Sequence, residues 1–277
     1  MTEIHEVLPN APLALVAVEV RLPNGATGSP LPMTVQRAFR DALGEGWVIQ
    51  SSRVQQVSLT IGPTGTLPQA LPPVTVQSFT VRDRTMAVAL TEESMTVQTT
   101  RYRHYPEFRK TLATAVEAAA TVLAPDGVAR VGMRYIDEIR VPRLEGGDPS
   151  GWVDWVDTSL VAPKLGPMAE AGFPVAAWEA AVQYQTGVDQ KLVLRYGTRT
   201  GYAVSPDGPL KRPDRPSPGP FFVLDFDSFW EPPEIPEFET ATIMAVCDSL
   251  RSPVRALFDQ LLTDGLLREF RKEKSVG

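Results

Sequence analysis

Two aspartates lie two positions apart in an apolar stretch near the end of the chain, FFVLDFDSFW at residues 221–230. In an extended strand, Asp225 and Asp227 point to the same face and lie about 7 Å apart along the chain. Two carboxylates on one face can hold Mg²⁺ when a third acidic group joins them. The spacing therefore raises a candidate metal site at these two residues.

The Asp-x-Asp spacing after an apolar strand also resembles the opening motif of the haloacid-dehalogenase phosphotransferases. In that family the motif lies on an early strand of a parallel sheet, whereas here it falls on the last strand, and Phe229 stands where the family has Thr. A metal-dependent phosphate-processing enzyme using Asp225 and Asp227 is therefore one alternative. The other interpretation is that both aspartates pair with arginines on neighbouring strands, with Arg134 and Arg195 as candidates.

A second group of charges alternates with apolar residues in VARVGMRYIDEIRV, residues 128–141. The period of two indicates a strand with one apolar face, on which Asp137 is the single acid. The opposite face carries a ladder of charged side chains: Arg130, Arg134, Glu138 and Arg140. Three guanidiniums on one face could bind a phosphate or a carboxylate. Alternatively, the ladder is a structural face balanced by Asp225, Asp227 or Glu19.

Basic and aromatic residues are interleaved in RYRHYPEFRK, residues 101–110. Such a mixture can bind single-stranded RNA through stacking and charge. The alternative is the start of a helix, with Pro106 in its first turn and with Tyr105 and Phe108 in the core.

Composition limits the possible chemistry. The chain has 277 residues, a net charge of -6 and a pI of about 5.1, which argues against bulk capture of nucleic acid. Its only histidines are His5 and His104 and its only cysteine is Cys247, so a multi-histidine zinc site and an internal disulfide are not expected. We expect no cofactor. The polar, acidic start lacks the pattern of a secretory signal, which predicts a cytoplasmic protein with no membrane span.

Hydrophobic periodicity predicts an α+β fold. Strands are expected over residues 14–22, 47–61, 76–82, 85–90, 94–100, 128–141, 176–184, 192–196 and 221–230, and helices over 34–43, 106–123 and 239–271, with a short helix over 152–160. Ser252-Pro253 should kink or split the last helix, and GPTGTLPQALPP is expected to form a loop. We predict curved antiparallel sheets packed against long amphipathic helices in two sub-domains, 1–145 and 146–277, that meet near residues 142–151.

Several segments together resemble an uncharacterised bacterial family of sporadic distribution. They are Asn10-Ala11-Pro12-Leu13 leading to Glu19-Val20-Arg21, the turn Thr91–Ser94, Tyr105 with Phe108, the strand Gly132–Ile139, and Phe258 with Thr263-Asp264. The chain departs from the family at Asp137 and Glu138, where Asn and Arg are usual. The resemblance implies no activity or cofactor. The sporadic distribution suits a mobile-element, toxin–antitoxin or phage-defence setting.

Taken together, the sequence favours a non-enzymatic binding protein. Its expected partner is another protein or a small anionic ligand, held by the face that carries Arg130, Arg134, Glu138 and Arg140. The metal-dependent enzyme and the RNA-binding module stay open as alternatives.

Overall fold

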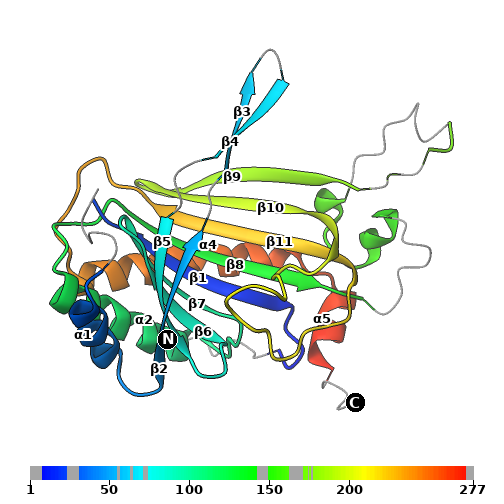
Figure 1. Ribbon diagram of the computed structural model, residues 1–277. Helices are drawn as coiled ribbons and strands as arrows, with labels where there is room; N and C mark the ends of the chain where they lie inside the picture. Colours follow the sequence, from blue (N-terminus) through cyan, green and yellow to red (C-terminus); the bar gives the residue numbers. More distant parts are fainter. Residues whose placement is uncertain are drawn as a thin grey trace, which may run out of the picture.

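The computed structural model describes residues 8–23, 31–54, 57–62, 65–70, 74–141, 149–161, 171–173, 175 and 177–272. Its centre is a nine-stranded antiparallel sheet in the order β2-β5-β6-β7-β1-β8-β11-β10-β9 (Figure 1). The strands of this sheet are β1 (Leu13–Arg21), β2 (Trp47–Val54), β5 (Val74–Val81), β6 (Met86–Leu90), β7 (Ser94–Thr99), β8 (Arg130–Ile139), β9 (Glu179–Gly187), β10 (Gln190–Gly201) and β11 (Gly219–Trp230). The predicted α+β class with an antiparallel sheet is confirmed.

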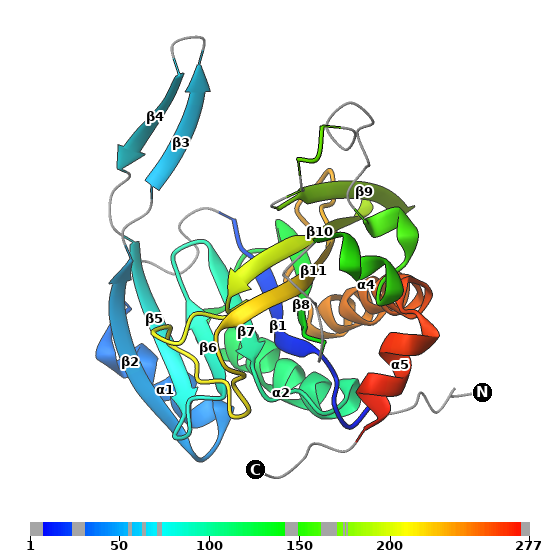
Figure 2. The same cartoon turned by 90° about the vertical axis from the view of Figure 1, so that its right-hand side faces the viewer.

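The main helices lie on one face of this sheet, as Figures 1 and 2 show. They are α1 (Met33–Leu43), α2 (Tyr105–Ala118), α4 (Thr240–Leu261) and α5 (Asp264–Arg271), and α2 continues as a π-helical turn, Ala119–Leu123. The His104 side chain caps α2 by accepting a hydrogen bond from the Glu107 N–H at 3.2 Å. None of the helices in the described ranges combines the length and apolar composition needed to cross a bilayer.

The core lies between the sheet and these helices because the strands alternate in hydrophobicity. Val16, Val18 and Val20 of β1 are fully buried, while the residues between them are only partly covered. Phe222, Leu224 and Phe226 of β11 face the helices in the same way, but Val223 and Asp225 between them are buried too, on the opposite face of the sheet. The strands therefore present an apolar face to the helices, and the opposite face carries polar side chains together with a small buried apolar cluster of Ile136, Phe221 and Val223.

Four predicted elements differ from the observed ones. The single strand expected over residues 47–61 is two strands, β2 and β3 (Val57–Gly62), and the expected loop after it contains β4 (Gly65–Ala70), which pairs with β3. The short helix expected over 152–160 is two 3-10 helices, Pro149–Asp154 and Thr158–Leu160.

The fourth difference concerns the last helix, which is divided at Leu262–Thr263 rather than at Pro253. Pro253 lies inside α4, whose neighbouring residues Leu250 and Val254 are buried in the core. The Thr263 side chain accepts a hydrogen bond from the Leu266 N–H at 3.2 Å and starts α5. The Thr263 hydroxyl also donates to the Trp155 carbonyl at 2.9 Å. A capping residue held by a tertiary contact therefore sets the break.

The two predicted sub-domains occupy separate parts of one sheet. The strands from residues 1–145 lie together, those from 146–277 lie together, and the two groups are joined by antiparallel pairing of β8 with β11. The described residues thus show a continuous sheet across the expected boundary. The division into two sub-domains stays a prediction.

Candidate functional site: a charged open face of the sheet

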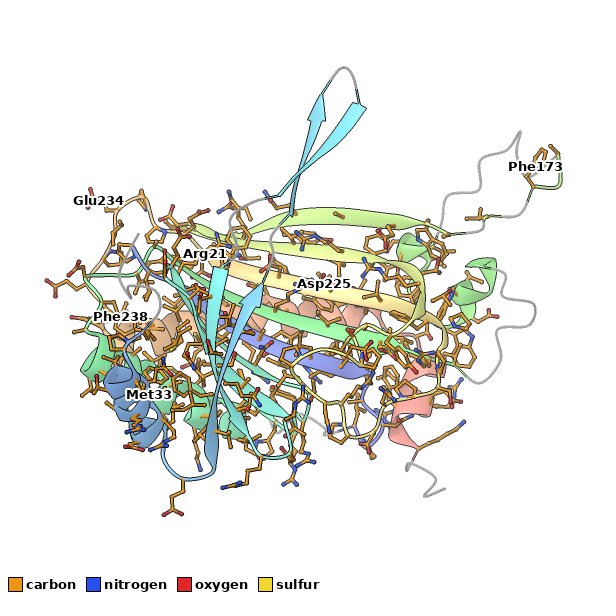
Figure 3. All side chains as sticks on the ribbon, in the orientation of Figure 1. Arg21, Met33, Phe173, Asp225, Glu234 and Phe238 are labelled. Carbon is orange, nitrogen blue, oxygen red and sulfur yellow. The ribbon has the colours of Figure 1, made fainter. Side chains whose placement is uncertain are left out.

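The face of the sheet turned away from α2 and α4 carries the charged residues singled out from the sequence. Strand register places Arg134 opposite Asp227 and places Asp225 opposite Arg195, so all four side chains share this face. Figure 3 shows Asp225 near the middle of the sheet. We call this surface the open face.

Asp225 forms the best-defined ion pair of the open face. Its two carboxylate oxygens accept hydrogen bonds from Nε and Nη2 of Arg134, both at 2.7 Å. This fork-to-fork geometry is the strong form of an arginine–carboxylate pair, and the bonded carboxylate raises the pKa of Arg134. The Asp225 side chain is only 7% exposed, whereas that of Arg134 is 49% exposed. Arg134 therefore satisfies a buried acid and still reaches solvent.

Asp227 lies between two arginines at longer range. One carboxylate oxygen is 3.4 Å from Nη2 of Arg130, and the other is 3.9 Å from Nη1 of Arg195. The prediction that both aspartates pair with arginines of neighbouring strands is therefore confirmed, and Arg130 is an additional partner. The Arg195 contact is the loosest of these pairs, so this guanidinium has the most capacity for another anion.

Arg130 is largely buried and makes several contacts at once. Its Nη1 donates to Glu19 at 3.0 Å, and its guanidinium lies 4.4 Å from the centre of the Phe229 ring. The space it occupies depends on Gly132, where an added Cβ would lie 2.5 Å from Arg130 Nη1. The Arg130 side chain is only 13% exposed, so its main role is to link β8 to the neighbouring strands.

Glu138 and Arg140 lie under a loop rather than on an exposed part of the open face. The loop, residues 202–218, connects β10 and β11 and crosses toward the β5–β6 turn (Figure 2, yellow). The fully buried Glu138 carboxylate accepts from Arg140 at 2.7 Å and from the Ala203 N–H at 2.8 Å. Arg212 Nη1 lies 3.0 Å from the same carboxylate, and burial lowers the pKa of Arg212. These residues anchor the loop.

Asp137 has the opposite orientation, as the alternation predicts. It is buried with the apolar residues of β8, and burial raises its pKa to about 8, although Arg212 and Arg255 oppose the shift. An uncharged carboxyl is therefore favoured at this position.

Two half-exposed arginines of β10 also lie on the open face, near the edge of the sheet. They were not among the ligand-binding residues expected from the sequence. Arg195 and Arg199 line a shallow hollow of about 270 Å³ together with Glu179, Ala180, Ala181 and Tyr196. Arg199 also donates to Glu179 at 2.8 Å in an exposed pair. The spacing of the two arginines in LVLRYGTRT, four apart on one strand, is the sequence signal that identifies them.

The close packing beside the hollow depends on Gly197, between the two arginines. Its φ of 155° and an added Cβ only 2.1 Å from the Trp178 carbonyl oxygen exclude a side chain there. The Thr198 N–H donates to the same carbonyl at 3.1 Å. The start of β9 is thereby drawn against β10.

The metal and RNA alternatives gain no support from the geometry. Over the described ranges, no group of three His, Cys, Asp or Glu side chains is arranged to hold a metal ion. In the 101–110 segment, Tyr105 and Phe108 are buried as the helix interpretation predicts. Arg109 forms two 2.8 Å hydrogen bonds with Asp248, and Arg101 forms one of 2.7 Å with Asp83. Two of the basic groups are thus paired within the fold.

Comparison with known proteins adds no relative. No protein-family model matches this chain, and no curated protein matches it.

Proposed function

We propose that this chain is a non-enzymatic binding protein whose open face takes an anionic group, carried by a small ligand or by an acidic segment of a protein partner. The observation that supports the proposal most directly is the presence of three half-exposed guanidiniums on the open face, two of which line the hollow. Arg134, Arg195 and Arg199 are 46–49% exposed. Lys191 lies on the same face of β10 as Arg195 and Arg199 by strand alternation.

The proposed ligand contacts are not the whole ladder expected from the sequence. Arg130 and Arg140 are themselves largely buried and have acidic or backbone partners, so we assign them to holding the fold, together with Glu138. Arg195 is the central contact because its own acidic neighbour is 3.9 Å away. Arg199 contributes because its pair with Glu179 is exposed and therefore worth little. An incoming carboxylate or phosphate can displace these weak contacts.

The test is a calorimetric titration with inorganic phosphate, citrate and a short poly-glutamate peptide. The double variant Arg195→Ala/Arg199→Ala should weaken binding about tenfold or more, because charge-assisted hydrogen bonds to the anion are lost. Arg37→Ala/Arg40→Ala on α1 is the charge-matched control and should bind like the natural chain. If none of the probes binds, or if both double variants bind equally, the proposed function is wrong.

A further inference from the structure

The edge strand β9 has a neighbouring strand on one side only. Within the part of the chain that the structure describes, β9 pairs with β10 and ends the sheet (Figure 1). A strand in this position presents a row of backbone N–H and C=O groups that can pair with another extended chain.

Exposed apolar side chains occur on this strand, in the segment before it and in the turn after it. Of the eight large hydrophobic side chains that are exposed in the described ranges, five lie between residues 173 and 188: Phe173, Val175, Val182, Tyr184 and Val188. Val182 and Tyr184 point to the helix side of the sheet by register, yet they are 37% and 40% exposed. The helices therefore leave this end of the sheet uncovered.

The strand also lacks the devices that usually protect a free edge. Natural edges carry lysine, proline or inward charges that prevent pairing with another chain. The sequence of β9, EAAVQYQTG, contains no Lys, Arg or Pro. Its single charge is Glu179 at its first residue, where Arg199 pairs with it.

The edge is also held in place before any partner arrives. Trp178, immediately before β9, donates its indole N–H to the Leu160 carbonyl at 3.1 Å and packs 5.8 Å from the Phe222 ring. At the other end, Gln190 donates to the Ser249 hydroxyl of α4 at 3.1 Å. Ordering the strand therefore costs little conformational entropy on association, which favours binding.

We propose that β9 pairs antiparallel with β9 of a second copy of this chain, about a two-fold axis at Gln183, so that one sheet runs through both subunits. In a two-fold antiparallel pair, the positions of opposing residues sum to a constant. With the axis at Gln183, Val182 faces Tyr184 of the partner subunit, and Tyr184 faces Val182 of the partner subunit. Glu179 faces Gly187 of the partner subunit, so no like charges meet.

This complementarity selects a second copy as the occupant. The register joins aromatic and β-branched side chains in two equivalent apolar pairs, a combination that stabilises antiparallel strands. A foreign strand would have to supply the same pattern, whereas a second copy already carries it.

A charge-exchange experiment tests both the interface and its register. The variant Val182→Lys/Tyr184→Lys places lysines opposite lysines, and its dimer should dissociate about 100-fold more readily in sedimentation equilibrium. Val182→Glu/Tyr184→Glu should fail in the same way, and an equimolar mixture of the two variants should recover the dimer. Met33→Lys/Ile235→Lys is the matched control, since both residues are exposed elsewhere in the fold.

A cross-link provides a second measurement that does not disturb the apolar pairs. Gln183→Cys should form an intermolecular disulfide on mild oxidation, because directly opposed residues lie within disulfide range. The natural Cys247 is buried and does not compete, and Gln185→Cys should cross-link less because it faces Ala181 of the partner subunit. The proposal is overturned if the natural chain is monomeric at every concentration, even if β9 binds an unrelated peptide. It is also overturned if lysines at 182 and 184 leave the dimer intact, or if Gln185→Cys cross-links better than Gln183→Cys.

Discussion

At the residue scale, the open face is defined by how its acids share a larger number of guanidiniums. Asp225 is nearly buried and takes both donors of Arg134, whereas Asp227 is shared between Arg130 and the more distant Arg195. Arg134 thus completes a nearly buried ion pair, whereas Arg195 is in a loose one. The two should differ in their contribution to stability.

Replacing Arg134 by Ala should lower the free energy of unfolding by about 2 kcal/mol, because the nearly buried Asp225 carboxylate loses both hydrogen bonds from Arg134. The loss is smaller than for a fully buried pair because Arg134 is half exposed. Arg195→Ala should change stability by less than about 0.5 kcal/mol. Urea denaturation measures both. Adding Asp225→Ala to Arg134→Ala should restore part of the lost stability, and equal effects of the two single variants would contradict this assignment.

At the element scale, the loop at residues 202–218 covers part of the open face. It is held there by side-chain contacts and not by strand pairing. Glu138 holds the loop at two points, the Ala203 N–H and the Arg212 guanidinium. Between these points, Arg84 donates to the carbonyls of Gly208 and Pro209, each at 2.9 Å. The loop therefore links β8 to the β5–β6 turn across the sheet.

Glu138→Ala should release the first part of this loop. The Ala203 N–H loses its acceptor, and the guanidiniums of Arg140 and Arg212 lose their carboxylate. Amide hydrogen exchange at Ala203 should become about tenfold faster or more, while the core of β1 keeps its protection. Glu179→Ala removes an exposed pair and is the control. Unchanged exchange at Ala203 in Glu138→Ala would show that the loop is held by its other contacts alone.

At the scale of the whole molecule, one sheet separates an apolar side, covered by helices, from a side that carries the paired charges and is partly covered by the 202–218 loop. Asp137 is the acid on the wrong side of this division, because it is buried with the core residues of β8. Its pKa of about 8 in the folded protein lies far above the 3.8 of an ordinary aspartate side chain. The folded state therefore binds this proton more tightly than the unfolded state does.

The consequence is a pH dependence of global stability with a definite sign. The contribution of Asp137 is fully present below the unfolded pKa and is lost as pH rises toward 8, at up to about 1.4 kcal/mol per pH unit. Asp137→Asn should remove this slope and make the protein more stable than the natural chain at pH 7. Urea denaturation at pH 5 and pH 7 gives the comparison. The interpretation fails if the two proteins lose the same stability between these pH values.

The sequence by itself determined which residues share a face, because the period of two in a strand is a local property. Alternation in residues 128–141 placed Arg130 and Arg134 opposite Val131 and Met133, and the structure has them so. The same reasoning predicted that Asp225 and Asp227 pair with arginines on neighbouring strands. The helix interpretation of residues 101–110 placed Tyr105 and Phe108 in the core, where they lie.

Only the tertiary structure decided which charge meets which, because that depends on strand order and register between segments far apart in the chain. The diagonal pairing of Arg134 with Asp225 follows from the contact of β8 with β11, 91 positions apart at these residues. The covering of Glu138 by a loop carrying Arg212 has the same origin. The position of β9 at the edge has the same origin, because the order of all the strands decides which strand ends the sheet. Local sequence patterns carry no information on these long-range contacts, and the candidate site consists of such contacts.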